Sequence, residues 1–476
     1  MKPNATITKL NADSRNLLGT YTRIGILYAL LIAFFWLIGY ETIYQHLTPF
    51  YALMHPTILH GENILWHIQS IIIVGALIAA TIKIVNRFNL FDDIEPDPKT
   101  QRKFIAWCIL LAILIPISIA MMRGGFDGIT QAYDRHGYEY NSDIGKGGSI
   151  QGLFSEYEKN HQFLSMHAKV HPPGPIALLW LMSMATFTTS PLMLSFGTIL
   201  LGGLSVIPFY LWTRDLFNPQ VATQSTLLYI FVPTIVIFTA TSADIMFMPF
   251  TLTMLMLFWR SITQGSFKYA VLAGIFYAFC TLLSFSLIGI GAFFGLIGLW
   301  KLKEAETRLH VIVTASGMII GLIMIHLAVY FWSDFNVFRA FELCKAQFDL
   351  DQHHLDLSDP RPASWVFKFI NPICWFFFAG IPISVLAIKQ FIDRKSDHRA
   401  LFIIITLTLF VLNLLYLARG EGERSSMYIM PFIVIPAGYY LAQLSQKNNS
   451  NQVFWMTLIL LAIQCWFTEA MLYTYW

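Results

Sequence analysis

Long apolar stretches dominate this sequence and leave few folds open to it. A helix needs about 20 mostly apolar residues to cross a bilayer. Such runs occur at 24–40, 64–85, 104–122, 175–189, 192–212, 222–239, 244–259, 268–282, 283–300, 309–332, 366–388, 400–418, 427–444 and 453–473. Several runs are short, and the pairs that adjoin near 189–192 and 282–283 have the length of re-entrant segments. We therefore predict an all-α, polytopic transmembrane helical bundle with about 11–14 spans.

Composition agrees with a membrane protein and excludes several other classes. Of the 476 residues, 56% are hydrophobic and 12% are charged, whereas soluble domains carry roughly 25% charged residues. The net charge of +3 is too small to indicate nucleic acid as a partner. The five cysteines are scattered without a C-x-x-C pair, so neither a disulfide framework nor a zinc site is indicated. The first apolar run lacks a cleavage site and is predicted to be an uncleaved span.

The positions of lysine and arginine predict the orientation, because short basic loops remain in the cytoplasm. Four stretches are basic: the N-terminal arm, 87–103, 301–308 and 389–399. We therefore predict a cytoplasmic N-terminus. The segments predicted to face outward are 41–63, 123–174, 334–364 and 419–426. This orientation requires that one of the two apolar segments between 175 and 212 does not cross completely.

Two sizeable extracytoplasmic loops, 123–174 and 334–364, hold most of the ionisable residues. In the first loop, apolar residues recur at helical spacing with polar residues opposite, which predicts an interfacial amphipathic helix. The apolar positions are Ile150, Leu153, Phe154, Tyr157 and Leu164. Transporters place ionisable groups inside their spans, and here those interiors hold few, chiefly Asp244, His326 and Glu469. This distribution favours an enzyme that acts on a lipid-linked substrate at the membrane surface.

The segment His171-Pro172-Pro173-Gly174-Pro175 closes the first loop and opens a span. Its prolines hold the chain extended and can fix His171 at the membrane surface. The alternative is an ordinary proline-rich helix start.

Arg424 ends a second motif, Arg419-Gly420-Glu421-Gly422-Glu423-Arg424, between two late spans. Its planar donors suit phosphate, and Glu421 or Glu423 can hold it in place. A charged hairpin is the alternative. Asp244 precedes an apolar run, and a helix cap is its favoured interpretation.

Asp134 and Asp143 precede the amphipathic segment. Inverting sugar transfer needs one carboxylate to take the proton of the acceptor hydroxyl, whereas a phosphate leaving group needs positive charge nearby. A solvated loop residue is the alternative interpretation for each of these acids.

The order of these motifs resembles the multi-span glycosyltransferases of the GT-C superfamily, which use polyprenyl-phosphate sugars; the likeness is to mannosyltransferases and extends over 104–430. The resemblance implies that an acid of the first loop is the general base, which maps onto Asp134 or Asp143. Family members place this acid near the end of the preceding span, which adds Asp127 as a further alternative. His171, Pro172 and Pro173 correspond to the family's H-P-P segment. Arg424 corresponds to a phosphate contact. Family members place the acidic loop directly after their first span, whereas here two further spans, those of the N-terminal extension, come before it.

We therefore predict three regions: an N-terminal two-span extension (1–103), a GT-C-like catalytic core (104–430) and C-terminal spans (431–476). The expected activity is transfer of a sugar, with inversion, from a polyprenyl-phosphate-linked donor to a lipid or glycan acceptor on the extracytoplasmic face of a bacterial inner membrane. Asp134, Asp143 and His171 are the predicted catalytic residues. Arg424 and Lys345 are predicted to bind the donor phosphate. The predicted supporting residues are Glu421, Glu423, Pro172, Pro173 and Asp244.

No cofactor is expected. A metal could bind through His353, His354 and Asp356, but adjacent histidines in a polar loop are more often solvated. Three alternatives stay open: a transporter or flippase of lipid-linked sugars, an O-antigen polymerase or ligase of the cell envelope, and a non-catalytic assembly partner.

Overall fold

The computed structural model describes residues 12–38, 64–92, 95–134, 137–358, 364–415, 422–471 and 474, and these contain helices and no strands. Side chains at both ends of the first helix and at 352–364 are outside the description. The predicted outward segment 41–63 lies outside it.

Eleven of the described helices have 16 residues or more. They are α1 (Ala12–Ile38), α3 (Ile64–Arg87), α4 (Pro98–Ala120), α14 (Met248–Gln264), α15 (Phe267–Leu283), α17 (Arg308–Ser333), α18 (Val337–Ser358), α19 (Ser364–Ala379), α21 (Arg399–Leu415), α23 (Met430–Asn448) and α24 (Gln452–Met471). The shorter α-helices are α5 (Asp127–Asp134), α6 (Ile150–Ser155), α7 (Tyr157–Asn160), α8 (Met166–Lys169), α9 (Gly174–Thr186), α10 (Pro191–Gly203), α11 (Val206–Leu216), α12 (Pro219–Ile230), α13 (Pro233–Phe238), α16 (Gly291–Lys301), α20 (Ile381–Ile392) and α22 (Gly422–Ser425). The 3₁₀ turns are η2 (Met121–Arg123), η3 (Tyr140–Asp143), η4 (His161–Phe163), η5 (Ala243–Phe247), η6 (Phe285–Ile290), η7 (Ala305–Thr307) and η8 (Met427–Ile429).

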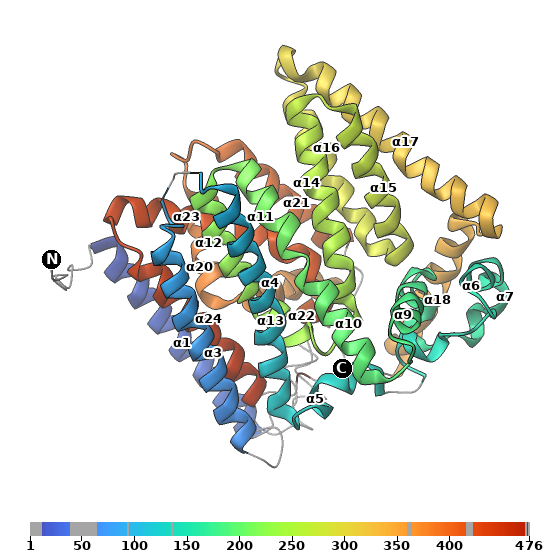
Figure 1. Cartoon of the computed structure of the whole chain (residues 1–476), viewed down its shortest axis with the longest axis horizontal. Coiled ribbons are helices and arrows are strands. Elements are labelled where there is room, and N and C mark those ends of the chain that lie inside the picture. Colours follow the sequence, from blue (N-terminus) through green and yellow to red (C-terminus); the bar gives the residue numbers. More distant parts are fainter. Residues whose placement is uncertain are drawn as a thin grey trace.

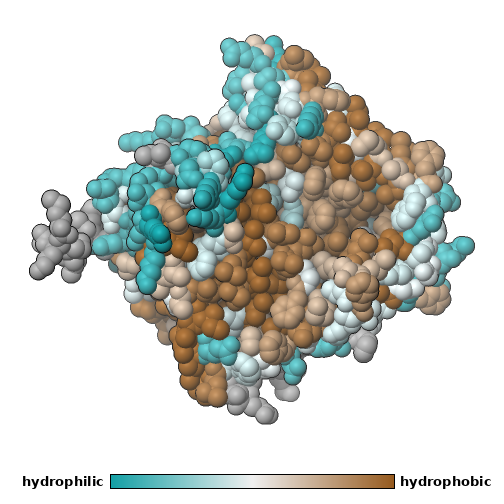
Figure 2. Space-filling view, viewed as in Figure 1, coloured by the Kyte–Doolittle hydropathy of each residue, from teal (hydrophilic) through white to brown (hydrophobic). Residues whose placement is uncertain are grey.

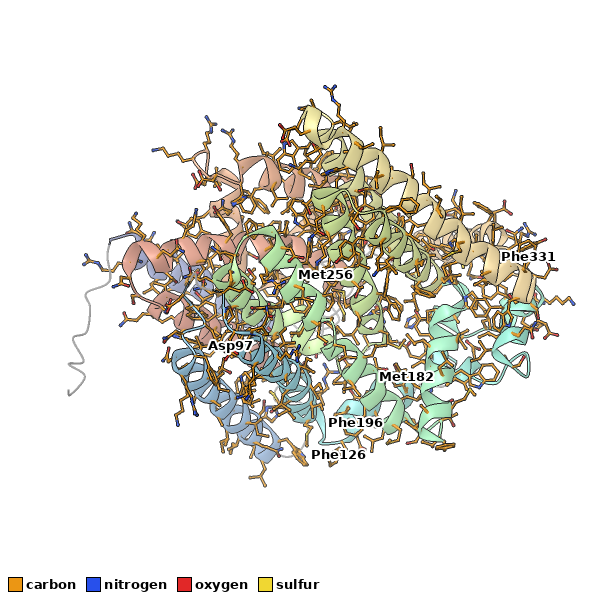
Figure 3. All side chains as sticks on the ribbon, turned by 45° about the horizontal axis from the view of Figure 1, so that its top comes forward. Asp97, Phe126, Met182, Phe196, Met256 and Phe331 are labelled. Atoms are coloured by element: carbon orange, nitrogen blue, oxygen red, sulfur yellow. The ribbon has the colours of Figure 1, made fainter. Side chains whose placement is uncertain are left out.

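The helices form the predicted polytopic bundle, and the chain is a multi-pass membrane protein (Figure 1). Seven stretches of the described chain are long and apolar enough to cross a membrane, or eight if the bent pair α19–α20 counts as one span. Figure 2 shows apolar side chains over much of one face, with hydrophilic side chains gathered along its upper and right margins. Exposed apolar residues such as Ile320, Ile323 and Phe331 on α17 suit contact with lipid. Figure 3 shows Phe331 at the outer end of that helix.

Within the described residues, seven or eight stretches are long enough to cross, against about 11–14 spans predicted, because several apolar runs fold into shorter helices. Four apolar helices of 10–17 residues add to the long ones: Gly174–Thr186, Phe267–Leu283, Phe285–Lys301 and Arg399–Leu415. The run at 222–239 is divided at Pro233 into α12 and α13, both buried within the protein. Hydrophobicity alone does not separate a buried broken helix from a lipid-facing span.

The lengths of α9 and of the next helices bear on the predicted orientation. Helix α9 has 13 residues, which corresponds to about 20 Å of rise against a hydrocarbon core of about 30 Å. The following stretch, Pro191–Leu216, has 26 residues and is long enough to cross. That one of the two segments between 175 and 212 does not cross completely stays a prediction, and α9 is the shorter of the two.

The predicted amphipathic segment separates its two faces as expected, but it is not one helix. Leu153, Phe154 and Tyr157 are buried while Ser155 and Glu156 are exposed, and the chain breaks into α6, α7, η4 and α8. Its apolar face packs on protein: the Phe154 ring lies 5.2 Å from that of Phe335, between α17 and α18. The prediction of a continuous interfacial helix was therefore wrong. Its apolar face packs against other helices of the protein, whereas we had expected it to contact lipid.

Helices α1 and α3 pack against the C-terminal helices, at the left of Figure 1. The Tyr28 ring of α1 lies 4.9 Å from Phe377 of α19 and 5.9 Å from Phe467 of α24. Trp466 Nε1 of α24 donates to the carbonyl of His67 on α3 at 3.4 Å. Helices α1 and α3 are thus part of one packed bundle with the C-terminal helices.

Candidate functional site

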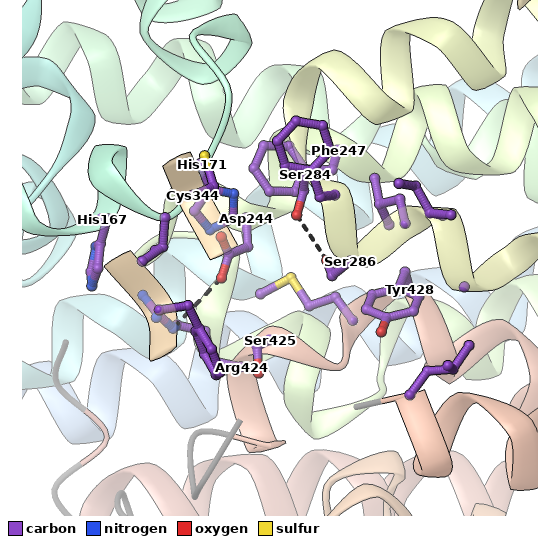
Figure 4. Close-up of a pocket in the computed structure, with 18 of the residues that line it drawn as sticks. His167, His171, Asp244, Phe247, Ser284, Ser286, Cys344, Arg424, Ser425 and Tyr428 are labelled. Atoms are coloured by element: carbon purple, nitrogen blue, oxygen red, sulfur yellow. Dashed lines mark hydrogen bonds and ion pairs between the residues drawn. The ribbon is translucent and has the colours of Figure 1, made fainter. Parts of the chain in front are cut away.

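A cavity of about 520 Å³ lies where segments from distant parts of the sequence converge (Figure 4). One end of the cavity is polar and its walls are mostly apolar. The polar and hydroxyl-bearing lining residues are Tyr140, His167, His171, Asp244, Ser284, Ser286, Lys345, Arg424, Ser425 and Tyr428. The apolar lining includes Phe247, Phe285, Leu287, Ile288, Phe341, Phe348, Leu412, Leu415 and Met427. This division suits an amphipathic ligand with an anionic head and a hydrocarbon chain.

The His-Pro-Pro-Gly segment places His171 in this cavity. Pro173 is the N-cap of α9, and Gly174 is its first residue. A Cβ atom on Gly174 would lie 2.1 Å from the carbonyl oxygen of Leu282, at the end of α15. Glycine is therefore required for this close approach. The segment is thus a proline-rich helix start that also places His171 at the wall of the cavity.

His171 is held in its neutral form. Burial lowers the pKa of His171 to about 4, although the carboxylate of Asp244 acts in the opposite direction. Its ring packs edge-on against Tyr140, with 5.6 Å between the ring centroids. Nδ1 of His171 is buried without a hydrogen-bond partner among the described residues. A neutral imidazole at the cavity wall can accept a hydrogen bond from a ligand hydroxyl.

Arg424 lies between two carboxylates that come from distant segments. Its Nε is 3.6 Å from Asp244 Oδ2, and its Nη1 is 4.0 Å from Glu139 Oε1. Figure 4 shows the contact with Asp244, which reaches the cavity from η5. The helix cap at this point is Ser242, whose side chain accepts from the Asp244 amide. The cap interpretation of Asp244 was therefore wrong, and its carboxylate is turned toward Arg424 instead.

Glu139 and His167 form a buried pair that sequence interpretation did not single out. His167 Nδ1 lies 2.9 Å from Glu139 Oε1. Burial tends to raise the pKa of Glu139, but His167 and Arg424 outweigh burial and hold this pKa below its usual value. The spacing of four residues between His167 and His171 was a visible signal. Nothing in the sequence indicated that residue 139 meets residues 167 and 424.

Asp134 and Asp143, the two predicted bases, do not line the cavity. Asp134 is exposed at the end of α5 and accepts from Thr130 Oγ1 at 2.5 Å. Asp143 is fully buried, pairs with Lys146 at 2.6 Å and accepts from the Ser165 amide at 2.9 Å. These contacts give Asp143 a structural role in closing the first loop. Asp127, the further alternative, is exposed at the start of α5.

The remaining predicted residues have different positions. Lys345, on the exposed side of α18, lines the cavity, as does Cys344 beside it. Glu423 is buried in α22 and accepts from Cys374 Sγ at 3.6 Å. Glu421 lies outside the described residues, and so do the side chains of the predicted metal candidates His353, His354 and Asp356. In the described part of the chain, no three His, Cys, Asp or Glu side chains are grouped as metal ligands.

The fold and the cavity define a multi-pass membrane protein with a cavity that is polar at one end and apolar along its walls. Residues 170–331 match the family model described as "Dolichyl-phosphate-mannose-protein mannosyltransferase". The match begins next to His171 and includes Asp244, Ser284 and Ser286. It confirms the resemblance of this chain to the GT-C glycosyltransferases.

The chain also resembles solved structures of the archaeal oligosaccharyltransferase AglB from Archaeoglobus fulgidus. For its complex with an inhibitory peptide and a dolichol-phosphate, the sequence identity is 14% and the TM-score is 0.43, over 78% of this chain and 56% of that chain. For the apo form, the identity is 13% and the TM-score 0.42, over 78% of this chain and 56% of that chain. The chain thus spans little more than half the length of these proteins. No curated protein matches it.

Proposed function

We propose that this protein is a GT-C-type glycosyltransferase that moves a sugar from a polyprenyl-phosphate-linked donor to a lipid or glycan acceptor. The observation that carries the proposal is the cavity, which joins a cationic end containing Arg424 and Lys345 to apolar walls. In this proposal the cavity opens on the extracytoplasmic face of a bacterial inner membrane and the N-terminus is cytoplasmic.

The donor would lie with its phosphate near Arg424 and Lys345 and its isoprenoid chain along the apolar walls. Arginine offers planar donors to phosphate oxygens, and lysine adds a point charge. Leu412, Leu415 and Met427 are close to Arg424 in the sequence. All three belong to the apolar lining of the cavity. Since these cations supply the positive charge, the proposed reaction needs no cofactor.

Asp244 is the proposed general base, because it is the carboxylate that lines the cavity beside Arg424. In the transfer step, Asp244 takes the proton of the acceptor hydroxyl while that oxygen attacks the anomeric carbon. The bond from the anomeric carbon to the phosphate oxygen breaks, and the phosphate leaves with the electron pair. Arg424 and Lys345 stabilise the charge on the departing phosphate. The neutral His171 forms part of the cavity wall beside the substrate without adding charge there.

The test is release of free polyprenyl phosphate by the purified full-length protein in lipid nanodiscs, with a panel of polyprenyl-phosphate sugars and acceptors. Asp244→Asn is expected to lower kcat by about 10²–10⁴-fold, and Arg424→Ala by about 10²–10³-fold. A chelator serves as a control and is expected to leave the rate unchanged.

Asp127→Asn, Asp134→Asn and Asp143→Asn are measured in parallel. If a well-folded Asp127 or Asp134 variant loses kcat while Asp244→Asn stays fully active, the general base is an acid of the first loop. The same protein is also reconstituted into sealed vesicles. Movement of the intact sugar-lipid across that bilayer, without release from any donor, would support the flippase instead.

A further inference from the structure

The two carboxylates beside Arg424 differ in their access to the cavity. Asp244 lines the cavity and its side chain keeps 16% of its surface exposed, whereas Glu139 keeps 3% and is not among the lining residues. They also approach different nitrogen atoms, Asp244 at Nε and Glu139 at Nη1. Glu139 therefore lies behind Arg424 as seen from the cavity, and Asp244 lies on the cavity side.

A phosphate that enters the cavity meets this arrangement from the side of Asp244. Two anions close together on one guanidinium repel each other strongly when water is scarce, and burial makes an uncompensated charge costly. Glu139 has a second partner in His167, at 2.9 Å. Asp244 has no comparable second cation among its described ion pairs. The phosphate is therefore expected to displace Asp244 rather than Glu139.

We propose that the donor phosphate takes the place of Asp244 on Arg424, while Glu139 remains as the permanent counter-ion of this arginine. This inference rests on the proposed glycosyltransferase function and adds the order of its steps. Before the donor binds, the carboxylate of Asp244 is occupied by Arg424. Donor binding releases that carboxylate, which then faces the acceptor hydroxyl. Binding of the donor thus makes the carboxylate of Asp244 available as general base for the acceptor.

The cycle closes without any further reactant. Asp244 takes the acceptor proton during transfer, and the phosphate leaves the anomeric carbon with the electron pair. After polyprenyl phosphate dissociates, Asp244 gives its proton to water and pairs with Arg424 again. Glu139 keeps Arg424 in place in both states and is therefore a positioning residue.

The first test measures binding of a short-chain polyprenyl phosphate to the full-length protein in nanodiscs, without acceptor. Asp244→Asn removes the competing anion and is expected to tighten binding by about tenfold, although it lowers kcat. Glu306→Gln is the matched control, because Glu306 is an exposed carboxylate in the α16–α17 turn, away from the cavity. It is expected to bind like the wild type. If Asp244→Asn instead weakens binding, Asp244 merely holds Arg424 in place and the exchange is wrong.

The second test separates Glu139 from Asp244. Glu139→Gln removes the group that holds Arg424 from behind, so it is expected to raise the KM for the donor by about tenfold with a smaller change in kcat. Glu139→Asp keeps the charge and is expected to restore part of the affinity. Tighter phosphate binding in Glu139→Gln, as in Asp244→Asn, would show that both carboxylates exchange and would overturn the distinction.

Initial rates with both substrates varied test the order directly. An ordered mechanism is expected, with the donor first and with polyprenyl phosphate competitive against the donor. Tight acceptor binding to the donor-free protein would contradict the inference while leaving the transferase intact. Absence of polyprenyl phosphate binding and of transfer in the wild type would instead refute the proposed function.

Discussion

At the scale of single residues, Gly174 shows why the His-Pro-Pro-Gly segment ends in glycine. The first turn of α9 contacts the backbone at Leu282 and Leu283, so that a Cβ atom at residue 174 would meet the Leu282 carbonyl oxygen at 2.1 Å. The sequence indicated a stiff segment that could fix His171. It did not indicate the glycine's role, because the contacting backbone belongs to α15, more than a hundred residues later.

We expect Gly174→Ala to separate α9 from α15 and to displace His171. The substitution should lower the stability of the protein by about 1–3 kcal/mol, as overpacking does in other cores. Thermal unfolding in detergent measures the loss, and the transfer assay should show reduced activity.

Gly295→Ala on α16 is the matched control for this prediction, since a Cβ atom there meets nothing within 4 Å. This variant should be unchanged or slightly more stable, because alanine favours a helix over glycine by up to about 1 kcal/mol. Equal melting of the two variants would mean that the close approach at Gly174 is unimportant.

At the scale of helices, the bend between α19 and α20 depends on one distant side chain. The two helices meet at 114°, and Gly380 between them has φ of 102°. Gln464 of α24 accepts from the Ile381 amide at 2.8 Å and donates to the Phe377 carbonyl at 3.1 Å. Unpaired backbone groups are costly in a bilayer, so this amide group stabilises the bend. The sequence predicted one continuous span at 366–388, since the stabilising partner lies on another helix.

Replacing Gln464 by leucine should therefore destabilise the bend. The Ile381 amide would lose its partner, whereas the Phe377 carbonyl would still accept from the Gly380 amide at 3.1 Å. The expected cost is therefore that of one unpaired buried group, about 1–3 kcal/mol. Gln464→Glu keeps the acceptor and should be intermediate between leucine and the wild type. Met456→Leu, at an exposed position of the same helix, is the control. The prediction is refuted if the leucine variant unfolds at the same temperature as this control.

At the scale of the whole molecule, a buried ion pair ties the end of α4 to the last helix. Arg123 and Glu469 are 2% and 1% exposed, and Arg123 Nη2 donates to Glu469 Oε2 at 3.0 Å. Thr474 also donates to Glu469, at 2.6 Å. In the sequence, Glu469 was an isolated acid inside an apolar run. The pair with Arg123 explains how this charge is tolerated in the bundle.

Breaking this pair from one side should be more harmful than removing it entirely. Arg123→Met leaves Glu469 as a buried unpaired charge and should cost about 3–5 kcal/mol of stability. The double variant Arg123→Met with Glu469→Met should be more stable than either single variant. A double-mutant cycle of thermal unfolding measures the coupling, and strictly additive losses would argue against a shared electrostatic role.

The sequence predicted the helical bundle and part of the cavity, for different reasons. Apolar runs report directly on burial in protein or lipid, so the fold class was accessible. Motifs with unusual residues indicated His171 and Arg424, and the cavity contains both. Asp244 was found in the sequence but assigned to a cap. The contacts of Glu139 with His167 and Arg424 could not be predicted from the sequence. They depend on which loops converge in space, and no pattern within a single loop reports this.

The convergence of distant segments also has a consequence for how the protein is made. The cavity takes residues from 140 to 428, so the ribosome must synthesise most of the chain before the last wall exists. Until Arg424 emerges and is inserted beside Asp244, neither carboxylate of the finished site has this partner. Newly inserted intermediates would therefore hold Asp244 without its counter-charge, while Glu139 already has His167. They are the species that membrane quality-control proteases and insertion chaperones would encounter.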